Sequence, residues 1–224
     1  LTVHYANQMH LTGAKDAVAD YTEKSADFHQ IVADMANIPR KQAKTINLGL
    51  SYGMGKQKLI KELGLDDNEA EELFTQYHNK VPFIRGLQDQ CARVALDRGY
   101  IRTIAGRRCR FDHWEHRFED SVPLPLEEAK EKYGDNLKRS YTYKALNRLI
   151  QGSAADMTKL AMLGLWEEGI VPHLQVHDEV DISVENTDQA RKVARIMENC
   201  IELAVPLVVD IELGRSWGET EELT

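Results

Sequence analysis

Four side chains between residues 40 and 52 have the types and the spacing to hold a phosphorylated ligand. Arg40, Lys44, Leu48 and Tyr52 recur at every fourth position, which forms one slowly turning stripe on a helix. A guanidinium and an ammonium group can hold phosphate oxygens, and an aromatic ring can stack beside a sugar or a base. Arginine and lysine at this spacing are also typical of a solvated basic face, so the stripe alone leaves both interpretations open.

The opposite side of the same segment is apolar. Ala43, Ile46 and Leu50 cluster there, where they can pack against the rest of the protein. Gly53 and Gly55 follow and are typical stop signals for a helix. Residues 40–53 therefore predict a helix with one buried face and one face available to a ligand.

Two adjacent carboxylates form the second candidate site. Asp178 and Glu179 follow His177 within a largely apolar, strand-like stretch over 172–184, where each charge must be paired or bound to a metal. Hard oxygen ligands suit Mg²⁺, and a pair of such ions would activate a nucleophilic oxygen and stabilise a leaving phosphate. Solvated acids at a polar strand tip are the alternative. The apolar residues share one parity, as in a continuous strand, and do not indicate a hairpin turn.

Asn147 and Gln151 form a third candidate site, for contacts with DNA. They lie one helical turn apart, and amides at this spacing can contact the hydrogen-bond acceptors that every base pair presents in the minor groove. Such contacts sense the geometry of a correct pair without reading its sequence. An ordinary polar helix face is the alternative for either residue alone.

The bulk composition supports a folded chain with a real core. Of the 224 residues, 42% are hydrophobic, which suffices for one large domain or two small ones. No apolar run reaches membrane-spanning length, and the N-terminus lacks the order of a signal peptide, so we expect no membrane association. The three cysteines show no metal-ligand spacing and are expected to be buried free thiols in a reducing compartment.

The net charge of −8 is unusual for a protein that binds nucleic acid, because neutralising phosphates requires lysine and arginine. Two segments have the opposite balance. Residues 38–62 hold six basic side chains against one acid, and residues 98–117 hold six arginines against two acids. Two basic patches on an acidic body fit a DNA groove, and they equally fit ordinary charge segregation.

Helical periodicity dominates the first hundred residues, and strand patterns follow. Helices are predicted over residues 28–36 (capped by Ser25 or Asp27), 40–53, 56–63, 67–77, 82–96, 141–168 and 187–204. A hairpin with a basic turn is predicted over 100–111, a loop with a short helix over 112–138, and strands over 172–184 and 207–213. This order predicts an α+β fold in which a helical part is joined to a smaller mixed part.

Together these strings resemble the motifs of family A DNA polymerases. The string over 40–53 is similar to the nucleotide-binding helix of that family, R-x-x-x-K-x-x-x-(F/Y)-G-x-x-Y-G, and departs from it only at Leu48. Q-V-H-D-E, which ends at Glu179, resembles motif C, where a hairpin turn carries a metal-binding aspartate. Residues 147–156 resemble the helix that contacts the primer-template end. Weaker matches are Asp27-Phe28-His29 and Gly106-Arg107-Arg108.

The resemblance implies a fold and a reaction. Residues 1–140 would form a mostly helical fingers subdomain, with the nucleotide-binding helix at 40–53 and a basic hairpin near 100–111. Residues 141–224 would form the C-terminal part of an antiparallel-sheet palm. The implied reaction is template-directed DNA synthesis, in which a primer 3′-oxygen attacks the α-phosphate of a dNTP with the help of two Mg²⁺ ions. Primer-template DNA and dNTPs are the implied partners.

The resemblance also implies a role for each matching residue. The dNTP would be bound by Arg40, Lys44, Leu48, Tyr52 and His29. DNA would be contacted by Asn147, Gln151, His177, Arg107 and Arg108. The metal would be held by Asp178, and the catalytic set would be Asp178, Glu179 and Lys44.

Three features depart from the family pattern. Leu48 stands where Phe or Tyr is usual beside the sugar, so we expect altered handling of analogues such as dideoxynucleotides. Tyr143 occupies a position where many members have arginine. The charged stretch over 112–138 looks more phage-like than bacterial. We expect a cytoplasmic location, which would be the host cell cytoplasm if the protein is phage-encoded.

Motif A of the family, D-x-S-x-x-E-x-R, would directly precede a segment like residues 1–6, and its aspartate is the second metal-bridging carboxylate. Because Asp178 alone should not hold two ions, we expect activity only when an N-terminal polymerase segment supplies motif A and the thumb. That segment would belong to the same parent chain or to a separate subunit. One alternative is a non-catalytic half of a split polymerase, inert without its partner chain. A metal phosphohydrolase built on His177 and Asp178 would need further ligands at metal spacing, and we find no convincing set.

Overall fold

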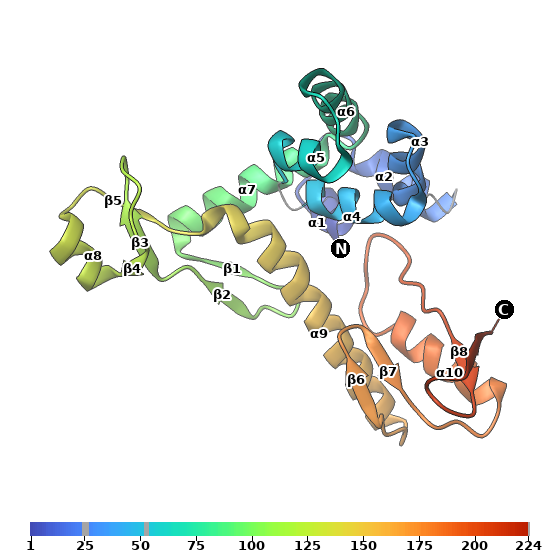
Figure 1. The fold of residues 1–224 in the computed structure, drawn as a ribbon. Coiled ribbons are helices and arrows are strands. Elements are labelled where there is room, and N and C mark those ends of the chain that lie inside the picture. The colour runs from blue at the N-terminus through green and yellow to red at the C-terminus, as the bar shows by residue number, and fades with distance from the viewer. Residues whose placement is uncertain (24–26, 52–53, 224) are drawn as a thin grey trace. The chain divides into compact units, whose positions relative to one another are not determined.

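The computed structural model describes residues 1–23, 27–51 and 54–223. The chain divides into two compact units. We call residues 2–150 the helical unit, and residues 151–224 together with Leu1 the C-terminal unit. Both contain helices and small antiparallel sheets, so the fold class is α+β, as predicted from the sequence (Figure 1).

The helical unit begins with a succession of helices. They are α1 (Thr2–Gln8), α2 (Ala14–Glu23), α3 (Phe28–Ala36), α4 (Arg40–Ser51), α5 (Lys56–Leu63), α6 (Asp67–Lys80) and α7 (Phe83–Arg98). The sequence predicted α3 and α5 with these bounds, and α4, α6 and α7 to within three residues. None of the helices in the described part of the chain is long and apolar enough to cross a membrane.

Local capping signals explain why these helices begin and end where they do. The carboxylate of Asp27 caps α3 by accepting hydrogen bonds from backbone N–H groups of its first turn. Asp66 and Glu69 form a reciprocal capping box at the start of α6. Helix α7 ends at Gly99, whose φ of 74° lies in the left-handed region that glycine adopts easily. The cap at Asp27 fixes the start of α3, the helix that carries His29.

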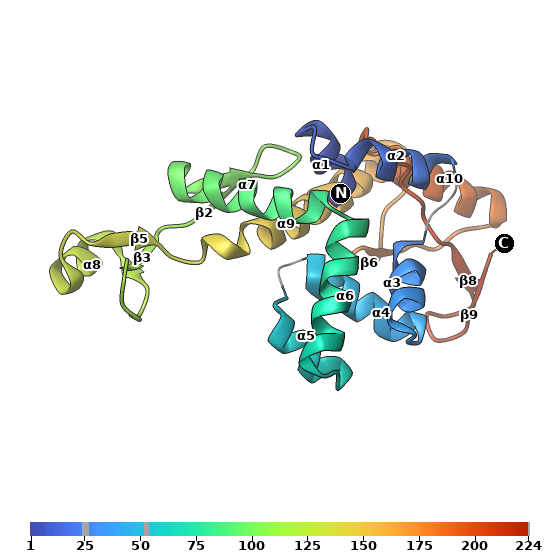
Figure 2. The same cartoon turned by 90° about the horizontal axis from the view of Figure 1, so that it is seen from above.

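Helix α4 has the two faces that its sequence predicted. Ala43, Ile46 and Leu50 are each at most 1% exposed, whereas Arg40 and Lys44 are exposed. Burying an Ile or Leu side chain stabilises a fold by about 1.5–3 kcal/mol, so the apolar face fixes α4 in place and leaves the basic face outward. Helix α3 lies beside α4 in both views of the ribbon (Figure 2).

The segment that follows α7 is richer in strands than predicted. Strands β1 (Tyr100–Arg102) and β2 (Arg108–Arg110) form the expected hairpin. Over 112–138, however, the prediction of a loop with one short helix is incomplete. There β3 (His113–His116), β4 (Leu124–Pro125) and β5 (Leu137–Arg139) form an antiparallel sheet in the order β4-β3-β5, with α8 (Leu126–Tyr133) packed against β3. Strands of two to four residues are too short to show a readable alternation.

A 3₁₀ turn, η1 (Thr142–Lys144), leads into the long helix α9 (Ala145–Glu167). These elements account for the helix predicted over 141–168. The boundary between the two compact units falls between Ile150 and Gln151, within α9.

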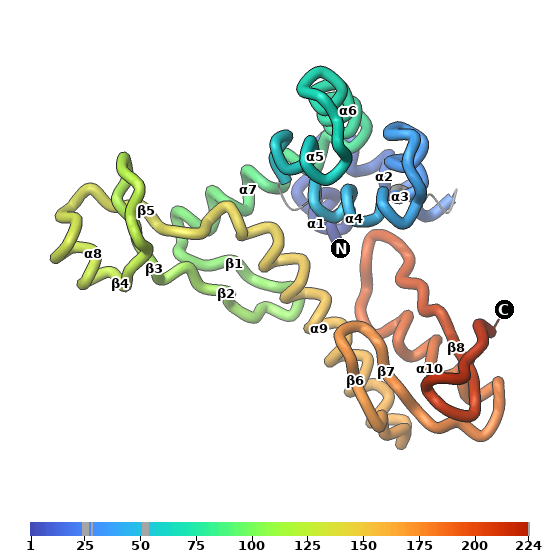
Figure 3. The backbone as a smooth tube through the Cα atoms, viewed as in Figure 1, coloured from blue at the N-terminus to red at the C-terminus, as the bar shows by residue number. Residues whose placement is uncertain are grey.

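The C-terminal unit contains the larger part of α9, a second helix and two hairpins, whose paths are visible in the backbone trace (Figure 3). Beyond α9 the elements are β6 (Leu174–Val176), β7 (Glu179–Asp181), α10 (Thr187–Glu198), β8 (Glu212–Gly214) and β9 (Thr220–Glu222). The helix predicted over 187–204 ends earlier, at Glu198. The strand predicted over 207–213 is strand only from Glu212 onward. Its earlier part is irregular, and the N–H of Val209 donates to the side chain of Glu198 instead of to a neighbouring strand.

Candidate nucleotide, DNA and metal sites

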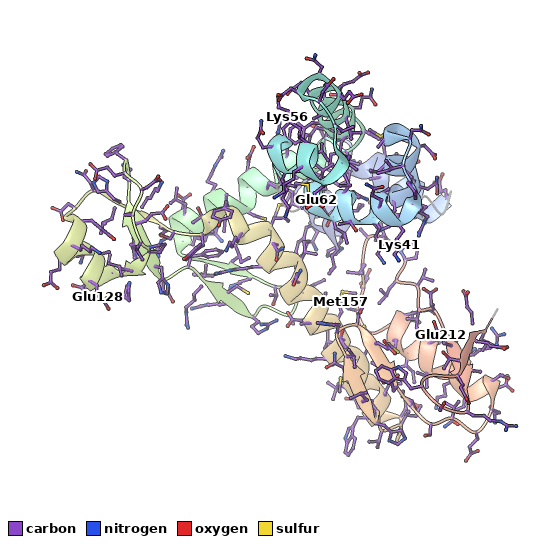
Figure 4. The ribbon with its side chains drawn as sticks, viewed as in Figure 1. Lys41, Lys56, Glu62, Glu128, Met157 and Glu212 are labelled. Atoms are coloured by element: carbon purple, nitrogen blue, oxygen red, sulfur yellow. The ribbon has the colours of Figure 1, made fainter. Side chains whose placement is uncertain are left out.

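Helix α4 presents the predicted phosphate ligands on one exposed face. Arg40 and Lys44 lie one turn apart and are both exposed, and Leu48, which is 42% exposed, continues the stripe. Lys41 is a further exposed cation on this helix (Figure 4). Tyr52, the remaining member of the predicted stripe, lies outside the described residues.

Asp27 links the start of α3 to the start of α4. Its Oδ1 accepts from the backbone N–H of His29 at 2.9 Å and of Gln30 at 3.1 Å, and its Oδ2 lies 2.6 Å from Nε of Arg40. Burial alone would raise the pKa of Asp27, but the bond from Arg40 and the two backbone N–H groups hold that pKa below its ordinary value. The ionised carboxylate therefore keeps the Arg40 guanidinium beside the first turn of α3.

His29 belongs to a hydrogen-bonded chain that reaches from α3 to α6. Its ring Nδ1 lies 3.0 Å from Nδ2 of Asn47 on α4, and Oδ1 of Asn47 accepts from the hydroxyl of Tyr77 at 3.0 Å. Asn47 is 9% exposed and Tyr77 is 2% exposed. The sequence analysis selected neither residue. A weak signal was present, since Asn47 interrupts the apolar flank of α4, but its partner lies thirty residues later in the chain.

The surroundings of His29 favour its neutral form. Burial lowers the pKa of His29, the carboxylate of Asp27 opposes this effect, and the charges of Arg40 and Lys44 lower the pKa further. The positive charges of Arg40 and Lys44 on α4 therefore act on the His29 ring. The structure brings Arg40, Lys44 and His29 together on adjacent helices, and such a group of donors can hold several phosphate oxygens.

The candidate DNA contacts occupy two elements. Arg107 and Arg108 are exposed on the β1–β2 hairpin, and the Arg108 guanidinium lies 4.8 Å from the ring centroid of Tyr100. On α9, Asn147 is half-buried and Gln151 is exposed, four positions apart on the same helix. The arginines can contact a phosphate backbone, and the amides can donate to groove acceptors.

The carboxylates lie at a hairpin turn. His177 and Asp178 connect β6 to β7, and Val176 pairs with Glu179 across the turn. The φ of His177 is 55°, in the left-handed region that costs a non-glycine residue about 1–3 kcal/mol and that recurs at functional sites. His177, Asp178 and Glu179 are all exposed. The hairpin agrees with the resemblance to motif C and not with the continuous strand that the shared parity of apolar residues indicated.

The hairpin register explains why parity misled. Directly opposite residues of an antiparallel pair share a face, so Leu174 shares its face with Asp181, and Val176 shares it with Glu179. Val180 lies opposite Gln175 on the other face. After the two-residue turn, even-numbered residues therefore lie on the opposite face from even-numbered residues before it. Leu174 and Val176 lie on one face of the sheet, and Val180 lies on the other.

Two further residues, Trp217 and Asp181, interact with Glu179. The indole Nε1 of Trp217 donates to Oε1 of Glu179 at 2.9 Å. Burial, the charge of Glu179 and a hydrogen bond with Glu179 raise the pKa of Asp181. The sequence analysis did not select Asp181 or Trp217, because neither stands in the H-D-E string.

No group of three or more His, Cys, Asp or Glu side chains within the described ranges is arranged to hold a metal ion. Asp178 and Glu179 nevertheless offer the hard oxygen donors that Mg²⁺ prefers, and both are exposed to an approaching ion. Their chemistry fits part of a magnesium site.

Comparison with known proteins gives consistent matches. A family profile described as DNA polymerase family A matches residues 2–219. A DNA-directed DNA polymerase of Pseudomonas phage M6 is 36% identical, over 98% of this chain and 36% of its own length. The thermostable DNA polymerase I of Thermus aquaticus is 32% identical, over 95% of this chain and 26% of its own length. The chain thus spans between 26% and 36% of these two relatives.

A solved structure is similar in fold as well as in sequence. It is the POL domain of Pol1 from M. smegmatis, in complex with DNA primer-template and dNTP. The TM-score is 0.64 at 27% identity, and the match covers 85% of this chain and 34% of that chain.

Proposed function

The chain belongs to DNA polymerase family A, and we propose that it supplies the nucleotide-binding part and one metal-binding carboxylate of a template-directed DNA polymerase. The observation that supports this most is the group formed by Arg40, Lys44 and His29 on α3 and α4. In the proposed reaction a bond forms between the primer 3′-oxygen and the α-phosphorus of a dNTP, and pyrophosphate leaves. Catalysis would consist mostly of positioning and charge stabilisation.

The α3–α4 group would bind the triphosphate. The guanidinium of Arg40 can bond two phosphate oxygens at once, and the ammonium of Lys44 adds a compact charge one turn further along α4. Lys44 would also donate a proton to the departing pyrophosphate. His29 would donate to a phosphate oxygen from α3. Leu48 and Tyr52 would shape the sugar site and the nascent base pair.

Other elements would hold the nucleic acid. Asn147 and Gln151 would contact the minor groove near the primer end, and Arg107 and Arg108 would contact the phosphate backbone. His177 would approach the primer terminus. In these terms residues 1–140 would correspond to fingers and residues 141–224 to part of a palm.

Asp178 would hold Mg²⁺, with Glu179 nearby. Mg²⁺ bound there would supply activation of the primer oxygen and neutralisation of charge on the phosphates. Because Asp178 alone should not hold two ions, we propose that a polymerase segment outside this chain provides a second carboxylate. Trp217 would keep Glu179 in place through its hydrogen bond.

Nucleotide binding to the whole chain tests the triphosphate site. The affinity for a dNTP is measured by equilibrium dialysis for the wild type, Lys44→Ala and Lys58→Ala. Lys58 is an exposed lysine on α5, so its variant loses the same charge. We expect Lys44→Ala to weaken binding roughly 10-fold or more, as removal of a charged hydrogen bond does, and Lys58→Ala to change it little. Equal effects would rule out a site on α4.

A further inference from the structure

A chain of three side chains runs from the surface of α3 into the interior of the helical unit. The Tyr77 hydroxyl donates to Oδ1 of Asn47, and Nδ2 of Asn47 lies against Nδ1 of His29, each at 3.0 Å. His29, at the outer end of this chain of side chains, is half-buried, and Asn47 and Tyr77 are buried. A buried polar group that loses its partner destabilises the fold, so each member of this chain constrains the next.

The direction of these bonds decides which nitrogen of His29 holds the proton. An amide oxygen only accepts hydrogen bonds and an amide nitrogen only donates them. Because the Tyr77 hydroxyl donates to the oxygen of Asn47, the nitrogen of Asn47 faces Nδ1 of His29. Nδ1 must therefore accept, and in the neutral imidazole the proton lies on Nε2.

We propose that Asn47 and Tyr77 are positioning residues, which hold His29 as the neutral Nε2–H tautomer so that this N–H donates to the phosphate of a bound nucleotide. The identity of the ligand rests on the proposed function, whereas the tautomer rests on the hydrogen bonds alone. His29 then acts as an oriented neutral donor near the charges of Arg40 and Lys44.

The charged groups around His29 act in the same direction as the hydrogen bonds. Arg40 and Lys44 disfavour a charged imidazole, and only the carboxylate of Asp27 favours it. A protonated ring would also place an N–H at Nδ1, directly against the N–H of Asn47. The amide would then have to rotate, and the Tyr77 hydroxyl would have to accept from Nδ2 of Asn47 instead of donating to its Oδ1.

The chain also connects three helices. His29 lies on α3, Asn47 on α4 and Tyr77 on α6. A displacement of α6 would therefore reach the phosphate-binding face through Asn47. On this basis Tyr77, which contacts no ligand itself, affects nucleotide affinity through His29.

Nuclear magnetic resonance of the full chain with ¹⁵N-labelled histidine tests the tautomer directly. Two-bond ¹H–¹⁵N correlations distinguish a protonated from an unprotonated ring nitrogen, and a His29→Gln variant assigns the signals. We expect a protonated Nε2 and an unprotonated Nδ1 at neutral pH. In Asn47→Asp, a carboxylate faces the ring and should move a proton to Nδ1. A wild-type ring protonated at Nδ1, or an unchanged ring in Asn47→Asp, would overturn the proposal.

Binding of inorganic tripolyphosphate tests the positioning role. Titration calorimetry compares the wild type with Tyr77→Phe and with Tyr133→Phe, a matched control whose hydroxyl bonds the carbonyl of Val122. We expect Tyr77→Phe to weaken binding roughly 3- to 10-fold, with a thermal unfolding transition that stays cooperative, and Tyr133→Phe to leave affinity unchanged. Equal affinities for both variants would overturn the positioning role.

The two measurements separate the inference from the proposed function. The tautomer is read without any nucleotide or polymerase activity. If the ring shows the expected tautomer but the chain does not bind tripolyphosphate, the phosphate ligand and the proposed function are overturned. The constraint that Asn47 and Tyr77 place on His29 would still stand.

Discussion

Nε of Arg40 lies 2.6 Å from Oδ2 of Asp27, so the arginine proposed to bind phosphate is already held by the acid that caps α3. The bond uses one donor of the guanidinium and leaves its Nη groups for a ligand. Both side chains are more than one third exposed, so the pair itself contributes at most about 1 kcal/mol to stability. In our proposal, its role is to orient Arg40 before the nucleotide arrives.

Asp27→Asn isolates the charge of this pair, because asparagine also caps helices well. The folded protein holds the pKa of Asp27 below its ordinary value. The resulting stability is therefore present above the unfolded value of about 3.9 and is lost as pH falls through the folded pKa. We expect urea unfolding to show a steeper loss of stability for the wild type than for the variant below about pH 4. Parallel profiles would mean that the pair does not form in solution.

Leu50 and Leu48 test the two faces of α4 by the same substitution. Leu50 is 1% exposed and Leu48 is 42% exposed. Leu50→Ala should destabilise the fold by about 2–5 kcal/mol through the lost burial and the cavity left behind, whereas Leu48→Ala should cost less than about 1 kcal/mol. Chemical denaturation of both variants checks this. A larger loss for Leu48→Ala would reverse the assignment of the faces.

Leu48 should also influence sugar selection, because it lies on the proposed nucleotide face. Leu48→Tyr should accept dideoxynucleotides better than Leu48→Phe, since its hydroxyl can replace a hydrogen-bonding group that the dideoxy sugar lacks. Competition between dideoxy and deoxy substrates measures the ratio, in primer extension by the chain completed with the N-terminal segment of a family A polymerase. Leu96→Phe on α7, which replaces another exposed leucine, is the control and should leave the ratio unchanged. Identical ratios for both Leu48 variants would exclude this position from the sugar site.

Much of the helical unit was predictable from the sequence because its signals are local. The capping residues Asp27 and Asp66 act within the first turn of the helices that they begin, and Gly99 acts within the last turn of the helix that it ends. The apolar face of α4 repeats with the helical period, so its burial followed from spacing alone.

The remaining features depend on contacts between distant residues. The sheet of β3, β4 and β5 is built from strands too short for periodicity, and its pairing is set by tertiary packing. The turn at His177 and Asp178 has no Asn-Gly signal, and the resemblance to motif C, not the residue pattern, placed it. Asn47 is functional in our account because of Tyr77, and nothing local indicates that pairing.

Primer extension with Asp178→Asn tests the central claim most directly. The assay contains Mg²⁺, dNTPs and primer-template, and it compares the chain alone with the chain completed by the N-terminal segment of a family A polymerase. Asp188→Asn is the matched control, because Asp188 is an exposed aspartate of the same unit, on α10. Our account predicts extension only by the completed polymerase, abolished by Asp178→Asn and retained by Asp188→Asn. Extension that persists in Asp178→Asn would contradict the assignment of Asp178 to the metal site. Extension by the chain alone would show that it needs no second carboxylate from outside.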